Sequence, residues 1–197
     1  KYSAKEQYIP TETTIAENGD VYIADGYGAQ YIMHYNAKGE LLQTFGGKGD
    51  ADHLFNNAHG ICIDTRNGKN PELLITARQQ NKLKRFTMDG EFIASIDLPG
   101  AFICRPVIKD DTIYLATIWS GDGSDGTGFI SILDKDNKLI SAPGGCKPVY
   151  GKNGLNPMFQ SIKIFTHPHD VCVDEDDNLY VAQWNSGKTY PIKLNRI

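Results

Sequence analysis

The stretch DVCVDEDDNLYVA, residues 170–182, holds two short apolar strands joined by an acidic turn, and related stretches recur along the chain. The other copies are TIAENGDVYIAD at 14–25, GICID at 60–64 with LLITAR at 73–78, and PVIKDDTIYLA at 106–116. Repetition at this scale indicates that each copy is one supersecondary unit. Since a single small sheet cannot bury both of its faces, we expect the copies to pack against one another.

Each copy is the first half of a larger unit. In the first two units, a polar loop, a third strand, a turn and a fourth strand follow, over residues 26–45 and 79–96. The turns contain Gly and Asn, which accept the positive φ that tight hairpins need. Each unit is therefore predicted to be a four-stranded antiparallel meander, and radial packing of such sheets gives an all-β fold, the β-propeller.

The repeats predict a single β-propeller domain over residues 1–197, and we expect it to be the C-terminal portion of a longer chain. Long loops at 46–58 and 141–165 interrupt the spacing, and loops of this length commonly cap a face or line a site. Only one short helical turn is expected, within 151–160. The predicted blades span roughly 10–50, 54–100, 101–143 and 165–197.

Composition excludes some classes of partner. The net charge is −4, which gives no reason to expect nucleic acid, and no apolar run is long enough to span a membrane. The four cysteines form no CxxC pair and have no metal-ligand spacing. Cys62 and Cys172 occupy equivalent positions on alternating apolar strands, so we interpret the cysteines as small core residues.

The stretch FGGKGDADHLFNNAHGICID, residues 45–64, resembles the NHL repeat. The pattern of that family is a Gly-rich turn, an aromatic residue, Asn, and then Pro-His-Gly-Ile-x-x-Asp; here Ala58 stands in place of the Pro. NHL repeats build propellers that commonly have six blades. The resemblance therefore implies an NHL-type β-propeller of four-stranded antiparallel blades, with four of six blades present.

Within that group, the chain is similar to the peptidyl-α-hydroxyglycine α-amidating lyases and their bacterial relatives. Their DGY motif matches residues 25–27, and their ADRENGR motif matches TARQQNK at 76–82. Their zinc-binding histidines match His59 and the PHD motif at 168–170. The resemblance implies that Tyr27 and Arg78 are catalytic and that His59 and His169 bind zinc.

The chain also departs from the lyase pattern. The third zinc histidine and another arginine of the lyases precede the DGY motif, so the resemblance implies a third ligand outside this chain. The arginine motif keeps Arg78 but loses its acidic residues. Gly28, Leu74 and Arg85 stand where the lyases have disulfide cysteines.

These residue types suit a metal site with an open position. Inner strands of a propeller converge on its axis, and His59 and His169 open strands in blades that are two apart. Imidazoles from alternate blades leave a coordination position vacant, as catalytic zinc requires, which can polarise a substrate oxygen. Arg78 could neutralise an oxyanion or bind a carboxylate, and Tyr27 could be a general base.

Structural interpretations stay open beside these. A histidine that begins a strand is often only a hydrogen-bonded residue, Tyr27 could pack at a blade top, and Arg78 could pair with a neighbouring blade. The protein is then either a metal-dependent lyase-like or hydrolase-like enzyme, or a non-catalytic NHL scaffold that binds a protein or glycan. The enzyme would take a small-molecule or peptide-like substrate in its channel, and the resemblance implies an extracellular or periplasmic location.

The remaining distinctive residues are predicted to be structural. We expect a hairpin loop rather than a calcium site at 120–128, because the terminal Glu of an EF-hand is missing. His53 and His167 are expected on surface loops, and His34 is expected to face out of its strand. Trp119 and Trp184 follow equivalent strands and are expected to pack in the core.

Overall fold

The computed structural model describes residues 2 and 7–196. The chain divides into two compact units, Lys1–Ile96 and Asp97–Ile197. Among the described residues, the first unit contains two antiparallel sheets and the second contains three, and consecutive strands are neighbours in each sheet. In the described part of the chain, no helix has the length and hydropathy that crossing a membrane requires.

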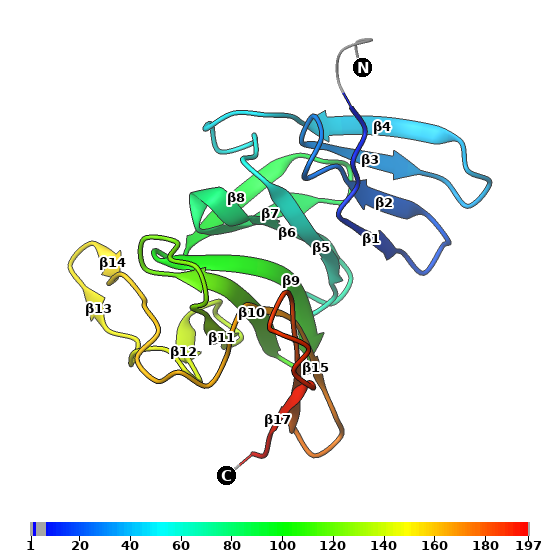
Figure 1. Ribbon diagram of the computed structural model, residues 1–197. Helices are drawn as coiled ribbons and strands as arrows, with labels where there is room; N and C mark the ends of the chain where they lie inside the picture. Colours follow the sequence, from blue (N-terminus) through cyan, green and yellow to red (C-terminus); the bar gives the residue numbers. More distant parts are fainter. Residues whose placement is uncertain (1, 3–6, 197) are drawn as a thin grey trace. The chain divides into compact units, whose positions relative to one another are not determined.

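The first unit is built from two four-stranded meanders, drawn in blue to green in Figure 1. Their turns place residues such as Gly19, Gly39 and Gly90 at positive φ, as the sequence predicts for tight hairpins. The first sheet consists of β1 (Glu12–Ile15), β2 (Val21–Ala24), β3 (Tyr31–Tyr35) and β4 (Leu41–Gly46). The second consists of β5 (Ala58–Asp64), β6 (Glu72–Ala77), β7 (Lys82–Thr87) and β8 (Phe92–Asp97).

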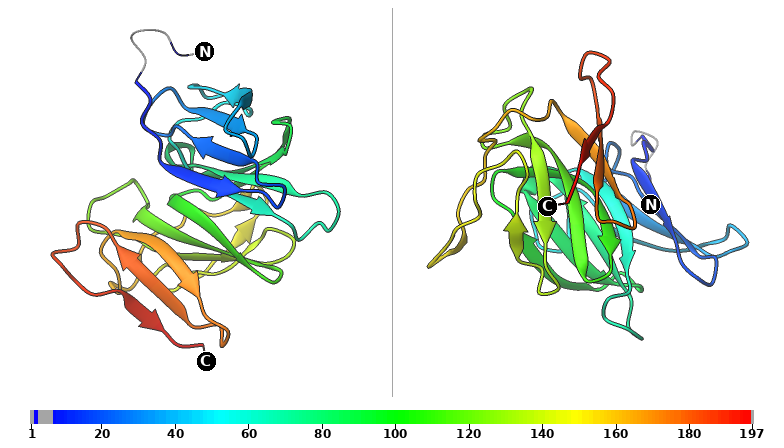
Figure 2. Two further views of the ribbon diagram at one scale, coloured as in Figure 1. Left: turned by 90° about the vertical axis from the view of Figure 1, so that its right-hand side faces the viewer. Right: turned by 90° about the horizontal axis from the view of Figure 1, so that it is seen from below.

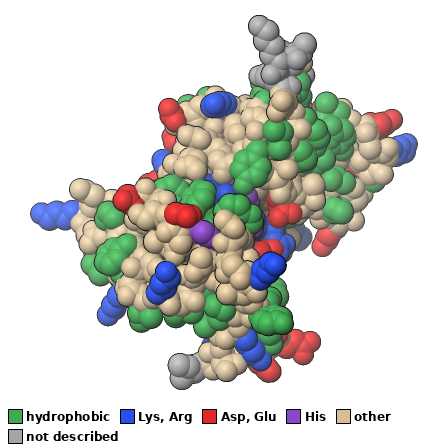
Figure 3. Space-filling view, in the orientation of Figure 1, with side chains coloured by type: hydrophobic (Ala, Val, Ile, Leu, Met, Phe, Trp, Pro, Cys, Tyr) green, Lys and Arg blue, Asp and Glu red, His purple; other side chains and the backbone are tan. Residues whose placement is uncertain are grey.

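The two sheets of the first unit share one hydrophobic core. Tyr22 and Ile32 of the first sheet pack with Leu73 and Phe86 of the second, all within one buried cluster. Every residue of β6 is buried, so this strand is covered on both faces. On the surface of this unit, Figure 3 shows hydrophobic side chains gathered over β3 and β4.

The second unit contains a four-stranded sheet, a three-stranded sheet and a small two-stranded sheet. Ile118 and Ile130 of the first of these pack with Val171 and Val181 of the second. The four-stranded sheet consists of β9 (Ala101–Lys109), β10 (Thr112–Ser120), β11 (Phe129–Leu133) and β12 (Leu139–Ser141). The three-stranded sheet consists of β15 (Pro168–Val173), β16 (Leu179–Gln183) and β17 (Ile192–Leu194).

The long loop of the second unit differs from expectation. The prediction of a helical turn within 151–160 is wrong, because β13 (Tyr150–Gly151) and β14 (Gly154–Leu155) form a small hairpin there. Gly154 has φ +103°, a conformation that suits a tight hairpin and not a helix. The hairpin projects away from the β9–β12 sheet, as the right-hand view of Figure 2 shows in yellow.

The prediction of an all-β chain built from four-stranded antiparallel sheets is confirmed for three of the four sheets that correspond to predicted blades. The fourth sheet has three strands among the described residues. The described helical structure consists of a single short 3-10 turn, η1 (Arg78–Gln80), at the end of β6.

Candidate functional site

Asp25 shapes the loop that carries Tyr27. Its buried carboxylate accepts hydrogen bonds from the backbone N–H groups of Ile9 and Ala29, each at 2.6 Å, and from the hydroxyl of Tyr2 at 2.6 Å. Burial and the bond to Asp25 raise the pKa of Tyr2 above its ordinary value, so Tyr2 stays a donor. Because three donors fix the carboxylate of Asp25, the loop is held in one conformation. Tyr27 points outward from this loop and is 54% exposed.

Gly26 fits this loop against the start of β5. A Cβ added at Gly26 would overlap the carbonyl oxygen of Ala58 and lie 2.7 Å from its carbonyl carbon. The amides of Asn57 and Gln30 each donate to the Gly26 carbonyl at 2.7 Å, and the Gln30 amide oxygen accepts from the Ala58 N–H at 2.9 Å. The loop is therefore fixed to the residue that precedes His59.

His59 is held in a β-bulge of the first unit. Ala58 pairs with Ala77 and Ile61 pairs with Ile75, so His59 and Gly60 together face only the intervening residue of β6. A bulge re-aims a side chain and is common beside functional sites. His59 is 6% exposed.

Arg78 lies in η1, directly after β6. Its backbone N–H donates to the carbonyl of Asn57 at 3.0 Å, and Asn81, with φ 53°, closes the turn through its own N–H to the Arg78 carbonyl at 3.1 Å. Asn adopts this left-handed conformation more readily than most residues. The turn directs the long Arg78 side chain inward, where it is only 2% exposed.

The first unit brings three of the four predicted site residues together. Nη1 of Arg78 donates a hydrogen bond to the Tyr27 hydroxyl at 3.4 Å. The rings of Tyr27 and His59 meet edge to face, with centroids 5.6 Å apart. The arrangement combines an accessible phenol, a buried guanidinium and a buried imidazole, which suits proton transfer beside developing negative charge.

His169, the fourth predicted site residue, belongs to the second unit. It is the bulged residue at the start of β15, since Pro168 pairs with Gln183 and Asp170 pairs with Ala182. A ring nitrogen of His169 lies within 4.8 Å of the Cys104 sulfur. Cys104 lies on β9 and is fully buried.

This pair supplies the donor atoms that zinc prefers. Zinc binds His nitrogen at about 2.0–2.1 Å and Cys sulfur at about 2.3 Å. In a tetrahedral site, two such ligands are separated by roughly 3.5 Å, which a pair within 4.8 Å approaches. The residues present therefore fit zinc chemistry.

Cys104 was not among the candidate ligands predicted from the sequence. The available signal was its position, because Cys104 stands in the third repeat where His59 and His169 stand in the second and fourth. The apolar neighbours of Cys104 on β9 instead suggested an ordinary core residue.

Two predictions about other histidines are wrong, and one is confirmed. His34 does not face outward: it is 8% exposed, stacks on Tyr22, and its Nε2 lies 2.8 Å from an Asp20 oxygen. His167 does not lie on the surface either: it is 3% exposed, and both of its ring nitrogens have partners. His53 is exposed on its loop, as expected.

The predictions for the cysteines and tryptophans are only partly correct. Cys172 is exposed, since it lies on the outward side of β15, and Cys62 is half-buried. Trp184 is 52% exposed and is not a core residue, whereas Trp119 packs against the core of the second unit. The loop at 120–128 joins β10 to β11 as the predicted hairpin connection.

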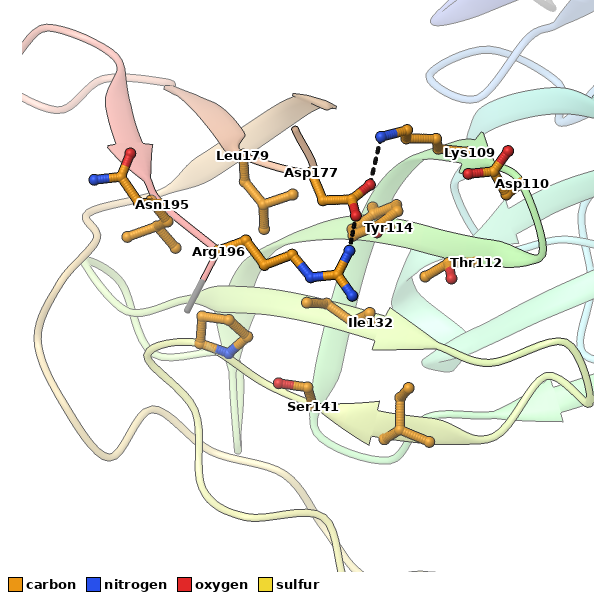
Figure 4. A pocket seen from close by; sticks show the side chains of 13 residues that line it. Lys109, Asp110, Thr112, Tyr114, Ile132, Ser141, Asp177, Leu179, Asn195 and Arg196 are labelled. Atoms are coloured by element: carbon orange, nitrogen blue, oxygen red, sulfur yellow. Dashed lines mark hydrogen bonds and ion pairs between the residues drawn. The ribbon is translucent and has the colours of Figure 1, made fainter. Parts of the chain in front are cut away.

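A groove of about 580 Å³ in the second unit contains none of the predicted site residues. Asp177 forms ion pairs with both Lys109 and Arg196 inside it, as Figure 4 shows. Tyr114, Ile132 and Leu179 also line the groove. Lys109 and Arg196 pair with the same carboxylate. We therefore interpret these ion pairs as a structural link between the two sheets that border the groove.

The chain is similar to known proteins, although no family model matches it. It is 25% identical over 195 residues to peptidyl-alpha-hydroxyglycine alpha-amidating lyase 1 of Drosophila melanogaster, an alignment that covers 89% of this chain and 33% of that protein. The chain thus spans about a third of the length of this curated relative.

Solved structures share the fold. A protein of unknown function from Bacteroides caccae is 14% identical, with a TM-score of 0.62 over 98% of this chain and 65% of the other. Virginiamycin B lyase from Staphylococcus aureus is also 14% identical, with a TM-score of 0.53 over 95% of this chain and 70% of the lyase. The four-stranded sheets of this chain are therefore β-propeller blades.

Proposed function

We propose that the protein is a metal-dependent enzyme, lyase-like or hydrolase-like, that resembles the peptidyl-α-hydroxyglycine α-amidating lyases. His59 and His169 bind zinc, and Tyr27 and Arg78 act on the substrate. The observation that carries the proposal is the convergence of Tyr27, His59 and Arg78 in the first unit, at the three positions where the lyase motifs match. The similarity to the Drosophila lyase supports it.

The reaction that suits these residues is cleavage of a carbinolamide. Tyr27, acting as the phenolate, takes the proton of the substrate hydroxyl, the oxygen electron pair forms a carbonyl, and the C–N bond breaks. Tyr27 then returns this proton to the departing amide nitrogen, so the products are a carbonyl compound and an amide, with no net oxidation. Tyr27 is exposed enough to reach a substrate.

Arg78 contributes orientation and charge. Its hydrogen bond to the Tyr27 oxygen keeps that oxygen in place, and its guanidinium can stabilise negative charge beside it. A second guanidinium nitrogen can bind a substrate carboxylate, which would hold an α-hydroxy acid with its hydroxyl toward Tyr27. Zinc, when bound, would supply Lewis acidity toward a substrate oxygen.

The finer features of the proposal come from the resemblance. The chain would supply four blades of a six-bladed NHL-type propeller, with a small-molecule or peptide-like substrate in its channel. The location would be extracellular or periplasmic, as for the lyase-like group. The rival function is that of a non-catalytic scaffold, which the loss of acidic residues around Arg78 favours.

Metal analysis combined with an activity assay tests the proposal. We expect purified protein to hold zinc in stoichiometric amount, to lose it in His59→Ala and His169→Ala, and to cleave a peptidyl-α-hydroxyglycine. His53→Ala is the matched control, since His53 is exposed on a loop, and it should keep the zinc. Folded wild-type protein that binds no zinc and has no turnover would instead establish the scaffold.

A further inference from the structure

Three blades carry a potential metal ligand at the same place in their strand register. In β5, His59 is the first residue after the pair Ala58–Ala77. In β15, His169 directly follows the pair Pro168–Gln183. In β9, Cys104 directly follows the pair Ile103–Thr117, and each of the three residues begins a shift in register.

The bulge in β9 presents Cys104 in the same manner as the histidines. Cys104 and Arg105 together face the residue between Leu115 and Thr117, as His59 and Gly60 face the residue between their paired neighbours. A β-bulge is a local departure from regular pairing that re-aims a side chain. A cysteine that only fills the core needs no bulge. The bulge at Cys104 therefore points to a role that Cys104 shares with His59 and His169.

An ion pair fixes Cys104 beside His169. Arg105 donates from Nε and Nη2 to the two carboxylate oxygens of Asp170, at 3.2 and 3.0 Å. Asp170 also accepts the backbone N–H of Val171 at 2.9 Å, which orients its carboxylate. Arg105 directly follows Cys104 in the sequence, and Asp170 directly follows His169. This bidentate ion pair therefore joins β9 to β15 beside the two candidate ligands.

We propose that Cys104, as a thiolate, binds a metal ion together with His169 in the second unit. The inference rests on the proposed function, which assigns His169 to zinc, and adds a ligand that was not expected from the sequence. The sulfur and a His169 nitrogen already lie within 4.8 Å of each other in a buried setting. Binding releases the thiol proton, and the second unit then supplies one nitrogen and one sulfur to the ion.

A thiolate ligand changes the chemistry of the site. It is softer than imidazole and donates more charge, so the site should favour zinc and Cu(I) over harder ions such as Mn²⁺. It also lowers the net charge of a bound divalent ion to +1, because the imidazole of His169 is neutral when it ligates.

Cobalt substitution tests this ligand directly. Wild-type protein loaded with Co²⁺ should show visible d–d bands and a near-ultraviolet thiolate-to-cobalt charge-transfer band. Cys104→Ser should lose the charge-transfer band while retaining at least part of the d–d absorption. Cys172→Ser is the matched control, because Cys172 is exposed on β15, and it should keep both features.

X-ray absorption of the zinc-loaded wild-type protein gives a second readout that needs no variant. One sulfur at about 2.3 Å is expected. Cobalt or zinc bound with no sulfur ligand, or a charge-transfer band that survives in folded Cys104→Ser, would overturn the inference and leave the proposed function standing. Folded wild-type protein that binds neither ion would overturn both.

Discussion

The guanidinium of Arg78 donates a hydrogen bond to the hydroxyl of Tyr27 over 3.4 Å, although the two residues are 51 positions apart in the sequence. Arg78 is 2% exposed and Tyr27 is 54% exposed. A buried cation thus holds an accessible phenol. The ring and the hydroxyl of Tyr27 have different partners, so the proposed role of the hydroxyl can be tested separately from the packing of the ring.

Tyr27→Phe should abolish most of the activity without affecting the fold. The ring keeps its edge-to-face contact with His59, whereas the hydroxyl that would accept the substrate proton is lost. We expect turnover of a peptidyl-α-hydroxyglycine to fall by about 10²-fold or more, with zinc content and melting temperature unchanged. Tyr190→Phe is the control, since Tyr190 is 89% exposed. Normal turnover in Tyr27→Phe would exclude Tyr27 as the base.

Gly26→Ala should destabilise the first unit. The added methyl group would meet the Ala58 carbonyl, so the loop or the start of β5 must move. We expect a loss of about 1–3 kcal/mol in the free energy of unfolding, measured by chemical denaturation. Gly151→Ala is the control, because its nearest neighbour is the Asn156 side-chain oxygen at 3.3 Å. Equal stability of the two variants would contradict the close approach at Gly26.

The strands were predictable from the sequence because their signals are local. Residues 21–24 alternate between half-buried and buried, which is the period of two that the sequence shows. The turns at Gly19 and Gly39 have the positive φ that their composition predicts. The helical turn expected within 151–160 failed because a short segment of Gly and Asn specifies a hairpin equally well.

The site was predictable only through matched motifs. Nothing local in the sequence indicates that Arg78 reaches Tyr27, because that contact depends on the packing of two sheets. Cys104 was missed because the apolar residues around it fit a core strand equally well, and its bulge is visible only in the strand pairing. His167 was misplaced because its burial depends on Asp125 and Gly126, about forty residues earlier in the chain.

Lys84 should make the stability of the protein depend on pH. Its ammonium group is fully buried, lies 5.3 Å from the centroid of the Phe55 ring, and donates to the carbonyl oxygens of Leu54 and Ala51. Burial, aided by repulsion from Lys82, lowers the pKa of Lys84 from 10.5 to about 8. Above pH 8 the native state has lost a proton that the unfolded chain still binds, so raising the pH favours the native state.

We therefore expect the melting temperature to gain a contribution from Lys84 that grows between pH 8 and 10. Lys84→Met removes the titrating group and should flatten this dependence, which differential scanning calorimetry would measure. Tyr22 has an opposing effect at higher pH, since burial raises its pKa to about 12 and the unfolded chain then deprotonates first. An identical pH profile in both proteins below pH 10 would refute the assignment to Lys84.

His167 should hold the loop between β10 and β11 in place. Its Nε2 lies 2.6 Å from an Asp125 oxygen and 2.7 Å from the Gly126 backbone nitrogen, and its Nδ1 lies 3.2 Å from the Trp184 carbonyl oxygen. One ring nitrogen cannot donate to Asp125 and accept from Gly126 at once, so only one of these two contacts is a hydrogen bond in any one protonation state of the ring. Loss of the imidazole removes both.

His167→Asn isolates this role of the side chain. His167 has φ 53°, and Asn tolerates that conformation, so the backbone is not strained further. We expect a loss of about 1–3 kcal/mol in stability and faster hydrogen exchange at 121–127. His53→Asn is the matched control, because His53 is exposed on its own loop, and it should change neither quantity. Unchanged exchange at 121–127 in His167→Asn would show that the loop is held by its own backbone bonds, such as Gly123 N–H to Ser120 O at 3.1 Å.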